Sequence, residues 1–237
     1  MPSISDAELG ALTQFAHELA DASGPAILPY FRSDARVDNK DETGFDPVTE
    51  GDKAGERAIR ELIAERFPNH GVLGEEYGET NQGAAFRWVL DPVDGTRAFI
   101  AGLPTWTTLI ALEADGAPIL GLIDQPFTAE RWTGSALGTS FRRPGQADVG
   151  LRTKRTQTIE DAVVSTTDPR PEIYFSSEQA EAFDAIARAA RLARFGLDAY
   201  AYAMVAQGGM DLVIETGLQV YDYSARPVRD DAAGGAN

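Results

Sequence analysis

The segment Asp91-Pro92-Val93-Asp94-Gly95-Thr96 follows a short apolar run, Phe86 to Leu90, which is typical of a buried strand. The proline of this segment fixes a turn, and the glycine lets the backbone approach a ligand closely. Residues 96–100 can begin a helix, whose first N–H groups are free to bind an anion. Because carboxylates bind phosphate only through a hard cation, the pattern predicts a Mg²⁺ site beside a phosphate site.

Further acidic residues stand at similar positions along the chain. Glu75 and Glu76 end a short apolar run, and adjacent strand ends can bring Glu75 close to Asp91. Asp52 lies at the start of an expected helix, and Asp222 follows an expected strand far downstream. Each acid alone is typical of a solvated surface. The set, with every member at a strand end or a helix start, indicates a shared site.

The patterns along the chain predict a layered α/β protein with two sheets. Apolar residues at helical spacing predict a first helix up to about Ala22, which Gly24-Pro25 should interrupt or kink. A second helix is predicted over 52–67. A meander of short antiparallel strands is predicted at 72–74, 86–90, 107–112, 118–123 and 130–133.

The stretch 134–155 is polar and carries glycines and arginines, which predicts a domain boundary. We expect an N-terminal α+β metal-binding domain over 1–140 and a C-terminal α/β substrate domain over 141–237. In the second half, strands are predicted at 162–164, 192–195 and 210–215, and helices at 177–190 and 199–207.

The composition excludes several classes of function. Acidic residues number 37 and basic residues 21 among 237, so the formal charge of −16 argues against a nucleic-acid or anionic-membrane partner. The absence of cysteine excludes disulfides, iron–sulfur clusters, thiolate zinc sites and a cysteine nucleophile. Neither a membrane-spanning run nor a signal-peptide pattern occurs, so we expect a soluble cytoplasmic protein.

Three parts of the sequence resemble, in order and spacing, the signatures of the inositol monophosphatase superfamily: Gly74-Glu75-Glu76, the segment 91–96 and Asp222. Members of this superfamily are Mg²⁺-dependent, lithium-sensitive phosphatases. The resemblance covers nearly the whole chain. It implies a layered αβαβα sandwich of the inositol monophosphatase and fructose-1,6-bisphosphatase type, a homodimer, and a small phosphorylated metabolite as substrate.

The resemblance also implies a ligand set for two or three Mg²⁺ ions. Glu75, Asp91 and the Val93 carbonyl would hold the first ion. Asp91, Asp94 and Asp222 would hold the second, and a third, weaker ion would contact Glu75.

The catalytic roles follow from the same resemblance. Thr96 and Asp52 would form a pair that helps to activate water, and Glu75 would also accept or relay its proton. The N–H groups of Gly95 and Thr96 would hold the phosphate. No covalent phosphoenzyme is expected, because the Asp-x-Asp-x-Thr motif of aspartyl phosphatases and the P-loop are both absent from the sequence.

Within the superfamily, three segments favour the histidinol-phosphate phosphatase branch, which acts late in histidine biosynthesis. Residues 196–202 resemble the Gly-x-Asp-Cys-Tyr-x-Tyr segment of that branch, and Tyr221-Asp222-Tyr223 also resembles it. Arg97-Ala98-Phe99 differs from the Thr-Asn-Phe that is usual in inositol phosphatases.

The substrate of that branch carries an ammonium group and an imidazole, which pair well with carboxylates. The expected substrate-binding residues are Asp94, Arg97, Asp198 and Glu215. Asp198 has a second interpretation as the N-cap of a helix that begins at Ala199. For Arg97, a subunit contact is the alternative to a substrate contact.

Two other functions remain open from the sequence. The first is an inositol-1-phosphate or broad polyol-phosphate phosphatase. The second is a non-catalytic metal-binding homologue, which the tail favours: Pro227 and several charges occur where the family usually continues with an apolar helix and a strand. Comparing the hydrolysis of histidinol phosphate with that of inositol phosphate distinguishes the histidinol-phosphate phosphatase from the first alternative. Mg²⁺ binding without hydrolysis of either ester would indicate the second alternative.

Overall fold

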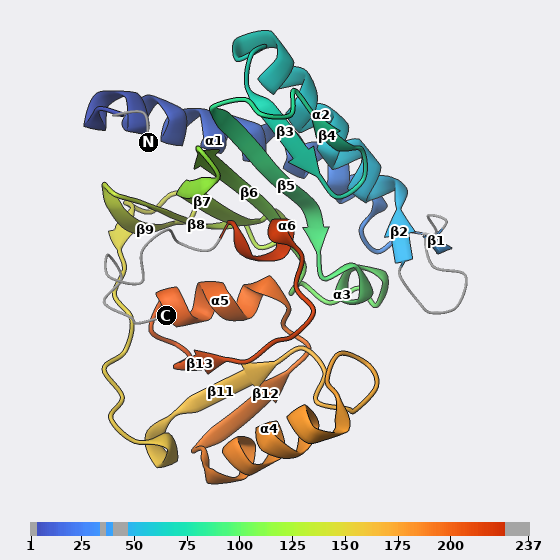
Figure 1. Cartoon of the computed structure of the whole chain (residues 1–237), viewed down its shortest axis with the longest axis vertical. Coiled ribbons are helices and arrows are strands. Elements are labelled where there is room, and N and C mark those ends of the chain that lie inside the picture. Colours follow the sequence, from blue (N-terminus) through green and yellow to red (C-terminus); the bar gives the residue numbers. More distant parts are fainter. Residues whose placement is uncertain (1–3, 34–36, 40–46, 226–237) are drawn as a thin grey trace.

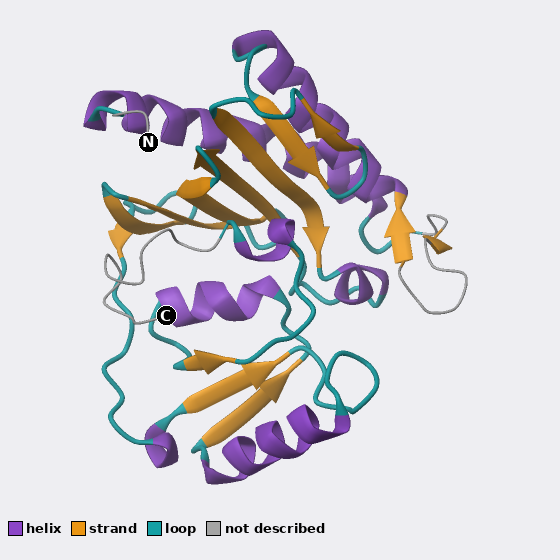
Figure 2. Cartoon of the chain, in the orientation of Figure 1, coloured by secondary structure: helices purple, strands orange, loops and turns teal. Residues whose placement is uncertain are grey.

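The computed structural model describes residues 4–33, 37–39 and 47–225. Helices and sheets alternate in layers: a pair of helices covers one side of a large sheet, further helices lie between the two sheets, and one helix lies outside the small sheet (Figure 1, Figure 2). The αβαβα sandwich predicted from the sequence is confirmed. The helices are α1 (Asp6–Ile27), α2 (Glu50–Arg66), α3 (Thr96–Ile100), α4 (Ser177–Ala189), α5 (Ala199–Ala206) and α6 (Val220–Tyr223), with 3₁₀ turns η1 (Leu28–Tyr30) and η2 (Ile159–Asp161).

The large sheet has the strand order β10-β9-β8-β7-β6-β5-β3-β4. Its neighbouring strands are antiparallel except for the parallel pair β3 and β5, so the predicted meander is confirmed from β5 onward. For 72–74 the antiparallel prediction is wrong, because β4 lies between β3 and β5 in the chain and returns the backbone to the same direction. A separate antiparallel pair, β1 (Val37–Asn39) and β2 (Pro47–Thr49), precedes α2. The strands of the large sheet are β3 (Gly71–Gly74), β4 (Gly78–Thr80), β5 (Phe86–Asp94), β6 (Thr107–Ala114), β7 (Ala117–Gln125), β8 (Glu130–Ser135), β9 (Gly138–Arg142) and β10 (Val149–Gly150).

Strand β5 is buried on both faces of the large sheet. Trp88 and Leu90 pack into the core beneath α1 and α2, whereas Val89 packs into the core beneath α5. This division follows from the pleat, which points successive side chains to opposite faces. Because β5 is packed on both faces, the acidic segment at its end has a rigid support.

Helix α1 corrects one prediction. The helix does not end near Ala22 but continues through Pro25 to Ile27. A proline inside a helix removes a hydrogen bond and costs about 3 kcal/mol. The last turn is stabilised by tertiary contacts that offset this cost, since Ile27 is fully buried against Phe31 and Trp106.

The polar stretch 134–155 also contains structure that the sequence pattern did not predict. Strands β9 and β10 lie there and extend the large sheet at one end. Both are short and partly exposed, so they carry little of the apolar alternation that reveals a strand. The division at residue 140 stays a prediction. Strand β10 continues the large sheet beyond that residue, and the later strands form a sheet of their own.

The small sheet is parallel, in the order β12-β11-β13, with strands β11 (Val163–Thr166), β12 (Leu192–Phe195) and β13 (Leu212–Val213). Helix α4 lies on its outer side, and α5 lies between the two sheets (Figure 2). Ala199, Ala203 and Ala206 of α5 pack against the large sheet, where their small side chains allow a close approach. The carboxyl ends of β5 and β11 therefore border the same cavity.

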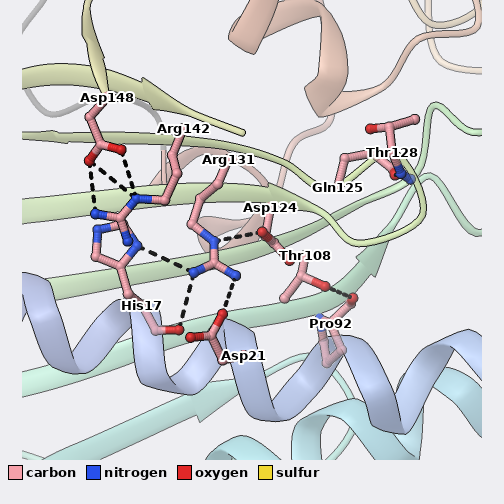
Figure 3. A network of polar contacts seen from close by, with 10 residues as sticks. All are labelled: His17, Asp21, Pro92, Thr108, Asp124, Gln125, Thr128, Arg131, Arg142 and Asp148. Atoms are coloured by element: carbon pink, nitrogen blue, oxygen red, sulfur yellow. Dashed lines mark hydrogen bonds and ion pairs between the residues drawn. The ribbon is translucent and has the colours of Figure 1, made fainter. Parts of the chain in front are cut away.

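A polar network fastens α1 to the large sheet (Figure 3). The Arg131 guanidinium donates to Asp124 Oδ1 and to Asp21 Oδ1, both at 2.7 Å, and to the His17 carbonyl at 3.3 Å. In the same view the Thr108 hydroxyl donates to the Pro92 carbonyl at 2.7 Å, which ties β6 to the acidic segment. Among the described residues, no helix has the length and apolar character needed to cross a membrane.

Candidate active site

The parallel pairing of β3 with β5 brings two carboxylates together. Gly74 is in register with Leu90, and the Glu75 N–H donates to the Leu90 carbonyl at 3.2 Å. Glu75 therefore leaves β3 beside Asp91, as the sequence predicted. Burial raises the pKa of Asp91 well above its usual range, and the nearby negative charge of Glu75 raises it further.

Three hydrogen bonds fix the turn that follows Leu90. The Val93 N–H donates to Asp91 Oδ1 at 3.0 Å, and the Thr96 hydroxyl donates to the Val93 carbonyl at 3.1 Å. The bond from Thr108 to Pro92 is the third. Gly95 lies at φ 79° in the left-handed region, which favours glycine, and α3 begins directly after it.

Asp91 and Asp94, at the end of β5, converge with Asp222 of α6. Each offers a carboxylate oxygen, and these atoms all lie within 4.8 Å of one another. Asp222 comes from α6, which packs against β5 and β6. Burial raises the pKa of Asp94 well above its usual range, and the Asp198 and Asp222 carboxylates add to this rise. Asp91 is buried, and Asp94 and Asp222 are partly buried. A set of such carboxylates that repel one another fits a hard divalent cation, which would remove the repulsion.

Asp52 and Thr96 are placed differently from the expected catalytic pair. Asp52, in the first turn of α2, accepts a hydrogen bond from the Thr49 N–H at 2.9 Å and another from the Thr49 hydroxyl. The Thr96 hydroxyl instead donates to Val93. Within the described part of the chain, the two side chains thus have separate partners. Burial raises the pKa of Asp52 to about 6, and Glu75 contributes to the rise.

The interpretation of Asp198 as a side-chain cap of α5 is wrong. The residue stands at the N-cap position of α5, but its side chain makes no capping hydrogen bond. The carboxylate of Asp94 takes that role instead, since its Oδ2 accepts from the Ala199 N–H at 2.7 Å. Asp198 has φ 48° and ψ −142°, an unfavourable conformation for a residue with a side chain. Such strain persists only where the surrounding structure enforces it.

The Asp198 carboxylate lies directly over Gly95. A Cβ on Gly95 would lie 2.8 Å from Asp198 Oδ2, so only glycine fits beneath this carboxylate. Burial raises the pKa of Asp198 to about 6, while the Thr167 hydroxyl and the Arg97 guanidinium lower it.

Glu215 faces the same space from the end of the small sheet. Its Oε1 accepts from the Thr167 N–H at 2.7 Å and from the Thr167 hydroxyl at 2.9 Å. Burial raises the pKa of Glu215. Thr167 follows β11, so the carboxyl end of a parallel strand supplies the partner that orients this carboxylate.

These residues line one cavity of about 460 Å³. The predicted site residues on its wall are Glu75, Asp91, Val93, Asp94, Gly95, Thr96, Arg97, Asp198, Glu215 and Asp222. Asp52 is buried behind them, with 1% of its surface exposed. Lys40 and Asp46, which precede Asp52, and the tail 226–237 lie outside the described residues.

Comparison with known proteins identifies the family. The model of the inositol monophosphatase family matches residues 8–236. The chain belongs to the inositol monophosphatase family. The acids that its sequence signatures brought together are therefore those of a phosphatase family.

Individual relatives agree with this assignment. The chain is 40% identical over 234 residues to the bifunctional phosphatase IMPL2 of Arabidopsis thaliana, and it spans 98% of its own length but 65% of that protein. It is 32% identical over 236 residues to the histidinol-phosphatase of Streptomyces coelicolor, covering 94% and 84% of the two chains. The structure of an inositol monophosphatase from Zymomonas mobilis matches with a TM-score of 0.80 and 37% identity, over 98% and 85% of the two chains.

The structure of this family member also reveals cavity residues that sequence reasoning missed. Thr167, Tyr174, Tyr202 and Gln219 line the cavity. Tyr202 lies inside the segment 196–202 that suggested the substrate branch, so this segment could have indicated Tyr202 as a cavity residue. Tyr174 lies in an irregular loop, where no periodicity indicates which side chains turn inward.

Proposed function

We propose that this chain is a Mg²⁺-dependent phosphate monoester hydrolase that converts histidinol phosphate to histidinol and phosphate, a step of histidine biosynthesis. The observation that carries the proposal is the pair of carboxylates Asp198 and Glu215. Both line the cavity beside the three-acid cluster, and neither belongs to that cluster.

The metal part of the proposal rests on the donor set. Glu75, Asp91 and the Val93 carbonyl would hold one Mg²⁺. Asp91, Asp94 and Asp222 would hold a second, and a third ion would contact Glu75. Mg²⁺ in such a site polarises phosphate oxygens and makes a neighbouring water more acidic.

The remaining roles belong to the chain itself. The N–H groups of Gly95 and Thr96 donate to the phosphate and orient the ester. Glu75 accepts a proton from the attacking water. Asp52, whose carboxylate is held by Thr49, assists from behind Glu75 and Thr96 by stabilising positive charge as the proton moves. Asp94 couples the two halves of the site, because the same carboxylate faces the cluster and caps α5.

Substrate choice follows from charge. Asp198 and Glu215 would pair with the ammonium group of histidinol phosphate and would favour the protonated form of its imidazole, since a nearby carboxylate stabilises an imidazolium. Their burial strengthens such pairs. A neutral polyol offers no positive charge to these carboxylates. Arg97 also lines the cavity, and its contact with the substrate would be to the phosphate, because a guanidinium repels the cationic groups.

The second candidate is an inositol-1-phosphate or other polyol-phosphate phosphatase. The likeness to the Zymomonas mobilis inositol monophosphatase, at 37% identity, favours it. The expected homodimer and the cytoplasmic location also stay predictions.

The deciding experiment compares kcat/KM for histidinol phosphate and inositol 1-phosphate in the presence of Mg²⁺. We expect histidinol phosphate to be the better substrate, and equal or faster hydrolysis of inositol phosphate would remove it as first choice. Mg²⁺ uptake without phosphate release from either ester would instead indicate a non-catalytic homologue. Asp198→Asn should reduce kcat/KM for histidinol phosphate far more than for a simple aryl phosphate.

A further inference from the structure

Tyr174 lines the cavity but has no role in the proposed hydrolysis. It lies in the loop between β11 and α4, and 41% of its surface is exposed. The Thr216 hydroxyl donates to the Tyr174 carbonyl at 2.7 Å. Because Thr216 follows Glu215 directly, this bond fixes the aromatic residue relative to a cavity carboxylate.

The face of the Tyr174 ring already carries a cation. The Arg97 guanidinium carbon lies 5.4 Å from the ring centroid, within the range of a cation–π interaction. The charge of Arg97 also lowers the pKa of Asp198, which places the guanidinium near that carboxylate. A flat, delocalised cation thus lies on an aromatic ring and close to a buried acid.

The electrostatics of the ring agree with this arrangement. Burial raises the pKa of the Tyr174 hydroxyl, Arg97 lowers it, and the Asp198 and Glu215 carboxylates raise it again. The ring therefore lies within electrostatic reach of all three charged side chains. At neutral pH the phenol is uncharged, and its face is the attractive surface for a cation.

We propose that Tyr174 is the aromatic wall of a subsite for planar cations, completed by Asp198 and Glu215, and that Arg97 holds this place until the substrate cation replaces it. The inference rests on the proposed function and deepens it, because it assigns the imidazolium ring of the substrate to the Tyr174 face. An imidazolium resembles a guanidinium in being flat and delocalised, so one surface serves both. A neutral polyol gains nothing from such a wall.

The test uses the full chain with three variants at this surface. Tyr174→Leu removes the aromatic face and keeps an apolar side chain, whereas Tyr174→Phe keeps the face and removes the hydroxyl. Ile173→Ala is the matched control, because Ile173 is the exposed neighbour in the same loop and does not line the cavity. For each protein, kcat/KM is measured for histidinol phosphate and for glycerol 2-phosphate, which carries no cation.

For Tyr174→Leu we expect the ratio of the two kcat/KM values to fall about five- to tenfold, because the partly exposed ring gives a cation–π interaction between the exposed and the desolvated values. Tyr174→Phe and Ile173→Ala should keep the wild-type ratio. Arg97→Met should lower KM for histidinol phosphate relative to glycerol 2-phosphate, since the substrate no longer competes with the arginine. A Tyr174→Leu variant with an unchanged ratio would overturn the inference.

A binding measurement separates this inference from the proposed function. Histidinol, which has the two cationic groups and no phosphate, is titrated into each protein by calorimetry. We expect Tyr174→Leu to weaken histidinol at least about fivefold and Tyr174→Phe to bind like the wild type. If the chain hydrolyses no phosphate ester, the proposed function has failed, and this titration still decides the subsite. Equal histidinol affinity in Tyr174→Leu and the wild type would overturn the subsite even where phosphatase activity is found.

Discussion

Replacement of Glu56 by glutamine should destabilise the protein strongly, although Glu56 lies outside the cavity wall. Its side chain is fully buried, and its Oε1 accepts from Arg60 Nε at 2.7 Å and from the Tyr77 N–H at 3.2 Å. Its Oε2 accepts from the Glu76 N–H at 2.8 Å. A Cβ on Gly74 would lie 2.0 Å from Oε1, so the carboxylate fills the space above this glycine. Glu56 thereby holds the turn that begins at Glu75.

The magnitude follows from these bonds. The amide oxygen of Glu56→Gln can replace only one carboxylate oxygen, so its NH₂ group faces either the Glu76 N–H or the donors from Arg60 and Tyr77. One unsatisfied buried donor costs about 1–3 kcal/mol, and weakening of the buried pair with Arg60 adds to this. Arg60 keeps 16% of its side chain exposed, which limits the second loss. We expect a decrease of about 2–4 kcal/mol in the free energy of unfolding.

Urea unfolding at pH 7, followed by tryptophan fluorescence and circular dichroism, measures this decrease. Glu50→Gln is the matched control, because Glu50 pairs with Lys53 on the same helix while 47% of its side chain is exposed. The control should lose no more than about 0.5 kcal/mol. A Glu56→Gln protein as stable as this control would refute the reasoning that the buried carboxylate supports the Glu75 turn.

Three further perturbations concern the glycine beneath Asp198, a buried histidine and the arginine beside Tyr174. Gly95→Ala should lower stability by about 2–3 kcal/mol and abolish phosphate release, because the left-handed backbone disfavours alanine and the new Cβ meets Asp198. Gly145→Ala, at φ 75° with open space around it, should cost only about 1–2 kcal/mol, and equal losses by thermal unfolding would contradict the close contact. Burial lowers the pKa of His17 to about 4. Between about pH 6.5 and 4 the unfolded chain therefore binds more protons at this residue than the folded chain does. As the pH falls through this range, protonation of His17 should lower the free energy of unfolding by up to about 3 kcal/mol. His17→Gln should flatten that part of the stability profile, and an unchanged profile would show that the buried imidazole does not titrate there. Arg97→Lys should keep the positive charge but weaken the contact with the Tyr174 ring. Free histidinol should then inhibit phosphate release with a lower inhibition constant. An unchanged inhibition constant would show that Arg97 does not compete for the ring.

Much of the metal cluster could be predicted from the sequence because local rules place its members. Asp91 and Asp94 stand at the end of a strand that is apolar on both faces, and Glu75 directly follows β3. The parallel pairing that brings these strand ends to one edge was not predicted, because the sequence pattern favoured an antiparallel meander. The assignment of metal ligands, Asp222 included, needed the resemblance to a family.

The parts that could not be predicted depend on tertiary contacts. The proline in α1 is tolerated because Ile27 is buried beyond it, which no local rule contains. The bond between Thr49 and Asp52 is an exception, since it has a local signal, a threonine followed by an acid three residues later. The helix was nevertheless predicted to begin only at residue 52, so this capping box was missed. Asp198 was expected to cap α5 because aspartate favours that position, yet Asp94 from the other half of the chain supplies the acceptor. Tyr174 gave no signal, since its place in the wall depends on how an irregular loop folds back.

Asp91, Asp94 and Asp222 should together bind a divalent cation. Calorimetric titration of the purified chain with MgCl₂, after removal of bound metal by a chelator, measures this binding. We predict saturable binding to the wild type and at least about tenfold weaker binding to Asp222→Asn, with both proteins shown to be folded by circular dichroism. A wild-type chain that takes up no Mg²⁺, or an Asp222→Asn variant that binds it equally well, would contradict the account.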